Sequence, residues 1–415
     1  MAVRIAVITR SLGINGASVF ILDLGYQLRR QGYDVEIVTT LSPGPLATNI
    51  VSQGLTWHHI HGFERSIPVF HIKKIARTLI DLKYDVIILN HDRYTQSIIS
   101  MLPDHTIVLP VLHNDQTKII NVAYANSQAW NVAVAVSEKL RERALTEHPE
   151  RPVVAIENGV QIPSVDAWTR RKPFSLPLEL LFVGRVNHEQ KGVLFLPQIL
   201  HDCSKRAIPV HLNVIGDGED LQRLKQRIAD EDQADHVTFY GTLPHEGVVN
   251  IMLQSHILLF PSFYEGFGLT VVEAQACGCI PVSSYLLKIT DRTILDGKTG
   301  FLVDIGDTGA MVNAIGKMVA APGEWTRMSA AAREFVMNQY SLERMGKDYA
   351  ALIEELLQGK YPLPRSRREL PAISTQLLSS RDYSPESFRI LGRKITAPFK
   401  HHHRSSHPPN QNYSY

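Results

Sequence analysis

The sequence predicts an α/β protein built from two doubly wound, Rossmann-like domains. Its 415 residues exceed the usual length of one domain, and a hydrophobic fraction of 44% is enough for more than one buried core. Near the N-terminus an apolar strand, an amphipathic helix and a second strand follow one another, and the same pattern starts again near residue 180. Such alternation is typical of parallel sheets covered by helices.

Composition and charge exclude several classes of protein. Lys+Arg 43 against Asp+Glu 41 gives a net charge of +2, without the basic surplus of a general nucleic-acid binder. No apolar run approaches the roughly 18 residues that a spanning helix needs, and the N-terminus enters a strand rather than a signal peptide. We therefore expect a cytoplasmic protein. The three cysteines agree with a reducing compartment, and Cys277-Gly-Cys279 is more typical of a helix end than of a metal or redox site.

The first predicted domain, residues 1–162, begins with a strand from Val3 to Thr9, and a helix follows from Val19 to Arg30. The loop between them carries Gly13-x-x-Gly16, which is not the G-x-G-x-x-G of redox dinucleotide enzymes, so that class is disfavoured. A later buried strand, Thr106 to Leu112, ends at His113. Polar residues at the carboxyl ends of parallel strands are well placed to bind a ligand, although a lone histidine is often only structural. The histidines 58, 59 and 61 favour a solvated loop over a metal site.

The most informative stretch runs from Phe260 to Ile280. A buried strand, Ile257 to Phe260, leads into the glycine-rich turn 265–268, and a helix is predicted over Leu269–Ala276 with Gly278 as its stop. A strand, a tight turn and a helix N-terminus in this order form an anion site, because the first helical N–H groups are free. An alternative remains open at this point: Thr270-x-x-Glu273 also fits a capping box, and Glu265 alone could be a loop carboxylate.

The second predicted domain, residues 178–339, places two cations on one loop. The strand Leu180–Val183 is followed by Gly184-Arg185 and Lys191-Gly192. The planar guanidinium of Arg185 and the compact ammonium of Lys191 are both suited to binding a diphosphate. The next strand, Val210–Ile215, ends at the turn Gly216-Asp217-Gly218. Residues 230–232 superficially fit an Asp-x-Asp metal motif, but they follow a helix without a flanking strand and are interpreted as a solvated acidic cluster.

Together these motifs resemble the retaining, nucleotide-sugar-dependent glycosyltransferases of the GT-B fold, the "group 1", family 4-like enzymes with the E-x7-E signature. The matching residues are Glu265 and Glu273 with seven residues between them, Val183-Gly184-Arg185 with Lys191-Gly192, and the turn Asn158-Gly159-Val160. The resemblance covers roughly residues 1–357. It implies two Rossmann-like domains that face a cleft, and transfer of a hexosyl-type sugar from a nucleoside-diphosphate sugar to an acceptor hydroxyl with retention.

The resemblance also implies roles for single residues. Glu265 would bind hydroxyls of the donor sugar, Glu273 those of the ribose, and His113 would contact the donor sugar from the other domain. Arg185, Lys191 and backbone amides would stabilise the departing diphosphate. These four, Arg185, Lys191, Glu265 and His113, form the expected catalytic set. The other positions expected at the donor are Gly13, Gly16, Gly184, Gly216, Gly266, Phe267, Gly268 and Leu269. No metal and no cofactor besides the donor substrate is expected.

The rest of the chain agrees less closely with the family. The pair of glycines that the family commonly places before the turn at Asp296 is missing, since Tyr285 to Asp291 contains none. We expect a linker over 163–177 and a crossover helix over 340–358 that returns to the first domain. Residues 359–415 are expected to be a disordered basic tail: from Tyr361 on it carries nine Lys/Arg and three acidic residues, and it could weakly attract anionic lipid at the inner face of the membrane.

Other functions stay open on the sequence alone. The expected acceptor is a glycan or a lipid-linked glycan, as in polysaccharide biosynthesis, which is only the commonest class in such families. A GT-B sugar epimerase or phosphorylase, or a catalytically silent sugar-nucleotide-binding partner, would carry many of the same motifs. A double-displacement glycosidase is disfavoured, because Glu265 and Glu273 both belong to one side of the predicted cleft.

Overall fold

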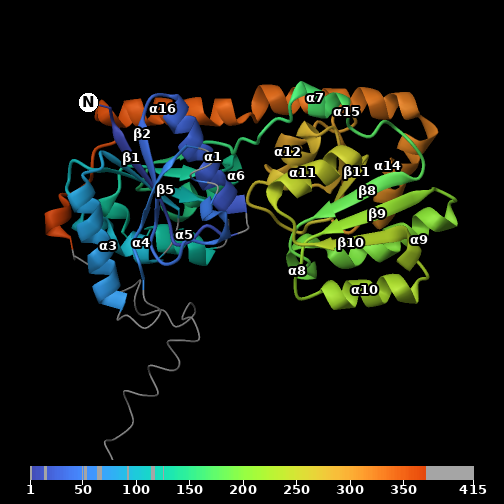
Figure 1. The fold of residues 1–415 in the computed structure, drawn as a ribbon, viewed down its shortest axis with the longest axis horizontal. Helices are drawn as coiled ribbons and strands as arrows, with labels where there is room; N and C mark the ends of the chain where they lie inside the picture. The colour runs from blue at the N-terminus through green and yellow to red at the C-terminus, as the bar shows by residue number, and fades with distance from the viewer. Residues whose placement is uncertain are drawn as a thin grey trace, which may run out of the picture.

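A computed structural model describes residues 2–13, 16–48, 50, 54–62, 68–90, 93–113, 117–124 and 126–370. In this part of the chain two parallel sheets form, one from each half (Figure 1). The expected α/β class with two doubly wound units is therefore confirmed.

The first sheet has seven parallel strands in the order β3-β2-β1-β4-β5-β6-β7. The strands are β1 (Arg4–Thr9), β2 (Asp34–Thr39), β3 (Thr56–His59), β4 (Val86–Asn90), β5 (Ile107–Leu112), β6 (Ala133–Ala135) and β7 (Val153–Ala155). Its helices are α1 (Gly16–Arg30), α3 (Pro68–Leu82), α4 (Arg93–Ile98), α5 (Thr117–Tyr124) and α6 (Glu138–Glu147). Ile5 of β1 pairs with Val35 on one side and Val86 on the other. The strand order therefore reverses at β1, which is where open α/β sheets bind ligands.

The second sheet has six parallel strands in the order β10-β9-β8-β11-β12-β13. The strands are β8 (Leu178–Val183), β9 (Val210–Ile215), β10 (Val237–Gly241), β11 (Ile257–Phe260), β12 (Ile280–Ser284) and β13 (Phe301–Val303). The helices are α8 (His188–Lys191), α9 (Leu196–Lys205), α10 (Leu221–Asp230), α11 (His245–Gln254), α12 (Leu269–Ala276), α13 (Thr290–Thr293) and α14 (Thr308–Ala320). Here the order reverses between β8 and β11, so this sheet too has a switch point.

Local sequence chemistry explains most of these elements. The central strands are apolar throughout because helices cover both faces, and β4, β5 and β11 are almost fully buried. Ser137 caps α6 by accepting from the Leu140 amide, as expected from its position before the helix. Helix α12 spans the predicted Leu269–Ala276, and Gly278 after it has a φ of +77°, the left-handed conformation that a helix stop requires.

Two segments link the halves. The segment expected as a linker contains the short helix α7 (Val165–Thr169), and the Arg333 guanidinium of α15 donates to the carbonyls of Pro163 and Ala276. Helices α15 (Pro322–Gln339) and α16 (Leu342–Leu357) then run along one side of both sheets (Figure 1). Helix α16 packs on α1 so closely that a Cβ on Gly346 would lie 2.6 Å from the Gln27 side chain. The C-terminal part of the chain thus completes the first domain.

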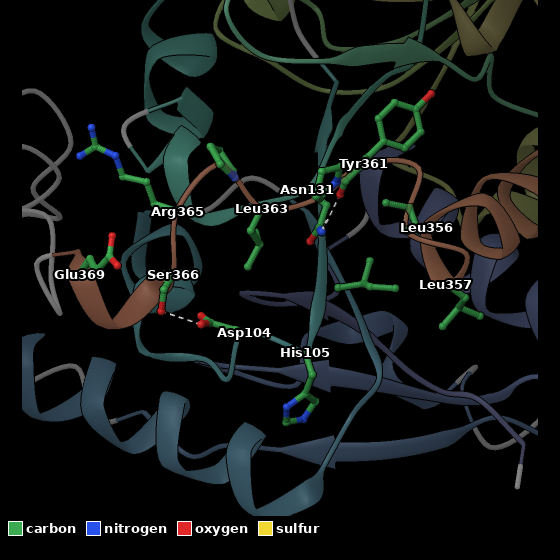
Figure 2. A pocket seen from close by; sticks show the side chains of 14 residues that line it. Asp104, His105, Asn131, Leu356, Leu357, Tyr361, Leu363, Arg365, Ser366 and Glu369 are labelled. Atoms are coloured by element: carbon green, nitrogen blue, oxygen red, sulfur yellow. Dashed lines mark hydrogen bonds between the residues drawn. The ribbon is translucent and has the colours of Figure 1, made fainter.

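The expectation that the tail is disordered from residue 359 is wrong for residues 359–370. The Arg367 side chain is fully buried and donates to the carbonyls of Ala129 at 2.7 Å, Thr106 at 2.9 Å and Pro103. Ser366 Oγ donates to the Asp104 carboxylate at 2.6 Å, and both residues line a cavity of about 670 Å³ between this segment and the first domain (Figure 2). The basic composition of this segment did not predict its ordered contacts, because a buried arginine cannot be distinguished from a solvated one by sequence. Residues 371–415 lie outside the described residues.

No helix in the described ranges is long and apolar enough to cross a membrane.

Candidate active site

A cavity of about 420 Å³ lies where the switch points of the two sheets face each other. One wall comes from the start of α1, with Gly16, Val19, Phe20 and Asp23, and from the turn 158–161. The other comes from the loops after β8, β9 and β10 and from the first turns of α12. The cavity therefore has the position that the GT-B resemblance implies for a donor and acceptor site.

The glycine turn presents the N-terminus of α12 to this cavity. Gly268 is the N-cap residue, with a φ of +87°, and no side chain caps the helix. Leu269, Thr270 and Glu273 line the cavity, and a Cβ on Gly16 would lie 3.2 Å from the Leu269 side chain. The capping-box alternative is excluded, because Thr270 lies inside the helix. The uncapped amides and the helix dipole favour an anion at this point.

Glu265 is not a solvated loop carboxylate. Its side chain is 8% exposed, and Oε1 accepts from Lys191 Nζ at 2.6 Å and from Ser262 Oγ at 2.8 Å. Lys191 Nζ also lies 5.4 Å from the centroid of the Phe260 ring. Neither Lys191 nor Glu265 is among the residues that line the cavity. The structure thus joins two of the predicted catalytic residues in one buried ion pair.

The loops after β8 and β9 approach each other through glycines. A Cβ on Gly216, whose φ is +132°, would lie 1.9 Å from the Gly184 carbonyl oxygen, and one on Gly218 would lie 2.4 Å from that of Val186. Only glycine tolerates this contact, which holds the two loops together at the cavity wall. Arg185 lines the cavity next to them, and its side chain is exposed. The guanidinium is therefore accessible to an anionic ligand.

Glu273 lines the cavity together with two groups that sequence reasoning missed. His245 Nδ1 is 3.7 Å from Glu273 Oε1, and burial lowers the pKa of this imidazole. Burial, together with the Asp23 carboxylate of α1, raises the pKa of Glu273 to about 8. Burial alone raises the pKa of Asp23 to about 7. The spacing of Asp23 from Gly16, two helical turns, was the available signal that both residues share one helix face.

The remaining predicted positions are distributed around the cavity. His113 is half-buried and contacts Phe20 edge-on, with ring centroids 4.8 Å apart, but it does not line the cavity. The Phe267 side chain is buried against Tyr340, with centroids 5.8 Å apart, so only its backbone is available to a ligand. Gly13 and Gly266 are half-buried and also lie outside the cavity lining.

The histidine and cysteine groups offer no metal site. Among the described residues no cluster of three His, Cys, Asp or Glu side chains is suited to a metal ion. His59 Nδ1 is 2.8 Å from Thr39 Oγ1, which gives this ring a hydrogen-bonding role inside the sheet edge. The thiols of Cys277 and Cys279 are buried, and burial raises the pKa of each, so both are poor nucleophiles.

The segment that lacks the glycine pair contacts the first domain instead. Lys288 adopts a left-handed backbone with a φ of +61°, and its ammonium pairs with Glu142 of α6. Arg292 of α13 lies 3.8 Å from the Glu157 carboxylate, which Arg344 of α16 also approaches at 3.9 Å. Cations of the second domain thus meet acidic residues of the first at the edge of the cleft.

Two family descriptions match the chain, one on each half. Glycosyltransferase Family 4 matches residues 14–162, and Glycosyl transferases group 1 matches residues 168–335. A phosphatidyl-myo-inositol mannosyltransferase of Mycobacterium leprae is 25% identical over 314 residues, 72% of this chain and 82% of that protein. A D-inositol 3-phosphate glycosyltransferase of Mycolicibacterium smegmatis is 27% identical over 362 residues, 76% of this chain and 81% of that protein.

Solved structures show the same fold. The Anabaena protein HepE in complex with UDP and glucose superposes with a TM-score of 0.71 at 16% identity, covering 85% of this chain and 100% of that one. The lipopolysaccharide outer core galactosyltransferase WaaB superposes with a TM-score of 0.66 at 18% identity, covering 85% and 99%. The two family matches together span residues 14–335 apart from a short gap, and with the shared fold they show that the chain belongs to the family 4-like, group 1 glycosyltransferases of the GT-B fold.

Proposed function

We propose that this glycosyltransferase moves a hexosyl-type sugar from a nucleoside-diphosphate sugar to an acceptor hydroxyl with retention and without a metal ion. One observation carries the proposal. The exposed guanidinium of Arg185 and the uncapped N-terminus of α12 face the same cavity from the ends of neighbouring strands β8 and β11. A diphosphate is the anion that this pair of groups fits, because it can contact both at once.

In this proposal the second domain, residues 178–339, holds the donor, and residues 1–162 present the acceptor. Arg185 and the amides of the α12 turn stabilise the diphosphate as the bond to the sugar C1 breaks. Lys191, held by Glu265 and packed against Gly184 of the cavity lining, adds positive charge on the side of the leaving group. The acceptor oxygen bonds to C1 on the same face, and its proton passes to the departing phosphate oxygen. The negative charge that develops on the departing diphosphate is thus neutralised without a metal.

The other roles follow from position. Glu273 lines the cavity one turn beyond the diphosphate site and accepts hydrogen bonds from the ribose hydroxyls. The Gly216 turn lies on the side of the nucleotide base, and Glu265 orients hydroxyls of the donor sugar. His113 of the first domain contacts the donor sugar. The HepE complex, which contains UDP and glucose, and the inositol-lipid name of the M. leprae relative support a nucleotide sugar as donor and a glycan or lipid-linked glycan as acceptor.

The test is a transfer assay with a panel of UDP-, GDP- and ADP-sugars, read by the anomeric coupling of the product in proton NMR. We expect one donor series to give a product with the donor's anomeric configuration in the presence of EDTA. An inverted product, or transfer restored only by Mg²⁺ or Mn²⁺, would contradict the mechanism. Consumption of donor without an acceptor would favour an epimerase, and binding without transfer or hydrolysis would favour a silent partner.

We further propose that the basic residues beyond Tyr361 bring the enzyme to anionic membranes, where a lipid-linked acceptor would be located. The support is their charge: apart from the buried Arg367, this stretch carries eight Lys/Arg against three acidic residues. Sedimentation with vesicles of anionic and neutral lipid tests this. Equal binding to both kinds of vesicle, or none to either, would contradict it.

A further inference from the structure

Asp23 is a carboxylate that the proposed function leaves without a role. It lies on α1, two turns beyond Gly16, and lines the cavity between the two domains. Its side chain is half-buried, and within the described residues no hydrogen bond or salt bridge reaches it. A carboxylate withdrawn from water without a partner is costly, so its position calls for a function.

Glu273 lies on the wall of this cavity that the second domain contributes. It lies one turn into α12, and the first turns of α1 and α12 touch where Leu269 meets Gly16. Both carboxyl groups line the same cavity. The two domains therefore bring two acidic groups together that lie 250 positions apart in the sequence.

The neighbours of the pair do not neutralise it. Around Glu273 the titratable or charged groups are His245 of α11, Arg185 and Asp217 of the loops after β8 and β9, and Cys277 and Arg333 at the far end of α12. Burial lowers the pKa of His245, so this ring is neutral at neutral pH. On the side of Asp23, Glu343 of α16 pairs with Arg30 and Arg344 with Asp348, and Lys347 of the same helix is exposed.

The two groups compete for a proton. Burial raises the pKa of Asp23 to about 7, and burial with the Asp23 charge raises that of Glu273 to about 8. Neighbouring carboxyl groups of this kind titrate as a pair, in two separate steps. At neutral pH the free enzyme therefore retains a proton that two solvated carboxylates would have lost.

We propose that Asp23 is a positioning residue that keeps Glu273 protonated in the free enzyme, so that donor binding is coupled to release of a proton. The inference rests on the proposed function, which assigns the ribose hydroxyls to Glu273. An ionised carboxylate accepts hydrogen bonds from two ribose hydroxyls with its two oxygens, whereas a protonated one keeps its carbonyl oxygen as the acceptor and turns the other oxygen into an O–H donor. The nucleotide therefore selects the ionised form, and its affinity rises with pH by up to about tenfold per unit for one released proton.

The first experiment needs no ligand. Urea unfolding is measured between about pH 5 and 8 for the wild type, Asp23→Asn, Glu273→Gln and the double variant, with Asp81→Asn as the exposed control on α3. Because the pKa values of both groups are raised in the folded state, the folded chain holds protons that the unfolded chain has lost. The stability that these groups contribute therefore falls as pH rises through this window. We expect Asp23→Asn to reduce this fall in stability with rising pH. The reduction should be smaller when Glu273→Gln is also present. If the effect of Asp23→Asn on stability is independent of pH, or is equal with and without Glu273→Gln, the two carboxyl groups do not titrate as a pair.

The second experiment measures calorimetric binding of UDP, GDP and ADP over the same pH range. The wild type should release a proton on binding, and Asp23→Asn should reach its full affinity about one pH unit lower, the interaction expected of a coupled pair. Asp81→Asn should follow the wild type. Coinciding profiles for Asp23→Asn and the wild type would overturn the linkage. Intact coupling in the first experiment with no nucleotide bound in the second would instead refute the proposed function, and with it the link to the donor.

Discussion

The two walls of the cleft differ in what they offer a ligand. The wall from the second domain carries charge that is already positioned, with Arg185 exposed and the N-terminus of α12 bare. Behind the residues that line this wall, Lys191 is fixed to Glu265 at 2.6 Å. The wall from the first domain offers backbone and apolar side chains, and among its described residues in the cavity Asp23 is the charged one. A wall with fixed charge suits the diphosphate, which every donor shares. A wall of backbone and apolar groups suits acceptors, which vary between enzymes.

The largest effect is expected from Lys191→Ala, which removes charge from the donor wall and leaves Glu265 buried without its cation. Transfer should fall by about 10²- to 10³-fold, the size seen when a preorganised electrostatic contact is removed. Initial rates at saturating donor measure this. Lys317→Ala, an exposed lysine of α14 in the same domain, is the matched control. A Lys191 variant with rates near those of the control would remove this residue from the donor wall.

A second large effect is expected in the first domain but away from the cleft. Arg367→Ala deletes a buried guanidinium that donates to three carbonyls. It should destabilise the protein by about 3 kcal/mol, because hydrogen bonds from charged groups contribute about 1.5–3 kcal/mol each and the cost of burying the guanidinium offsets part of their sum. Urea unfolding with the exposed neighbour Arg368→Ala as control checks this. Equal stability of the two variants would mean that the C-terminal segment does not hold the first domain.

Gly216→Ala tests the glycine contact behind the donor wall. Because its Cβ would lie 1.9 Å from the Gly184 carbonyl oxygen, the loop must move, at a cost of about 1–3 kcal/mol for a strained backbone. Thermal unfolding and nucleotide affinity should both decrease. Gly323→Ala in α15, where a Cβ meets nothing within 4 Å, should leave both unchanged or slightly improved. If Gly216→Ala had the same thermal unfolding and nucleotide affinity as Gly323→Ala, the two loops would not be held together by this glycine contact.

The smallest effect is expected where the walls meet. Lys288→Glu and Glu142→Lys each replace an exposed ion pair with a repulsive pair, and each should change the donor KM by about twofold to fivefold at low salt, in line with 0.2–1 kcal/mol for such pairs. The double exchange should restore the wild-type value, and 0.5 M salt should reduce all differences. If the change in donor KM of the double variant is the sum of the two single changes, the ion pair does not bridge the domains.

Sequence reasoning succeeded where the chemistry is local. The bounds of α12 and the left-handed Gly278 follow from residues within one strand, turn and helix, and so does the placement of Arg185 after β8. It failed where distant segments meet. The sequence cannot show that Phe267 packs on Tyr340, or that Arg367 enters the first domain. Asp23 beside Glu273 is of the same kind, because their approach depends on how two separately folded sheets face each other.

The central claim is that the second domain holds the diphosphate of the donor without a metal. The most direct measurement compares the affinities of a nucleoside diphosphate and the monophosphate of the same base in EDTA, for the wild type and for Arg185→Ala and Lys191→Ala. The account predicts that the wild type prefers the diphosphate and that both variants lose this preference while still binding the monophosphate. Equal affinity of the wild type for both nucleotides, or a preference that appears only with added metal, would contradict it.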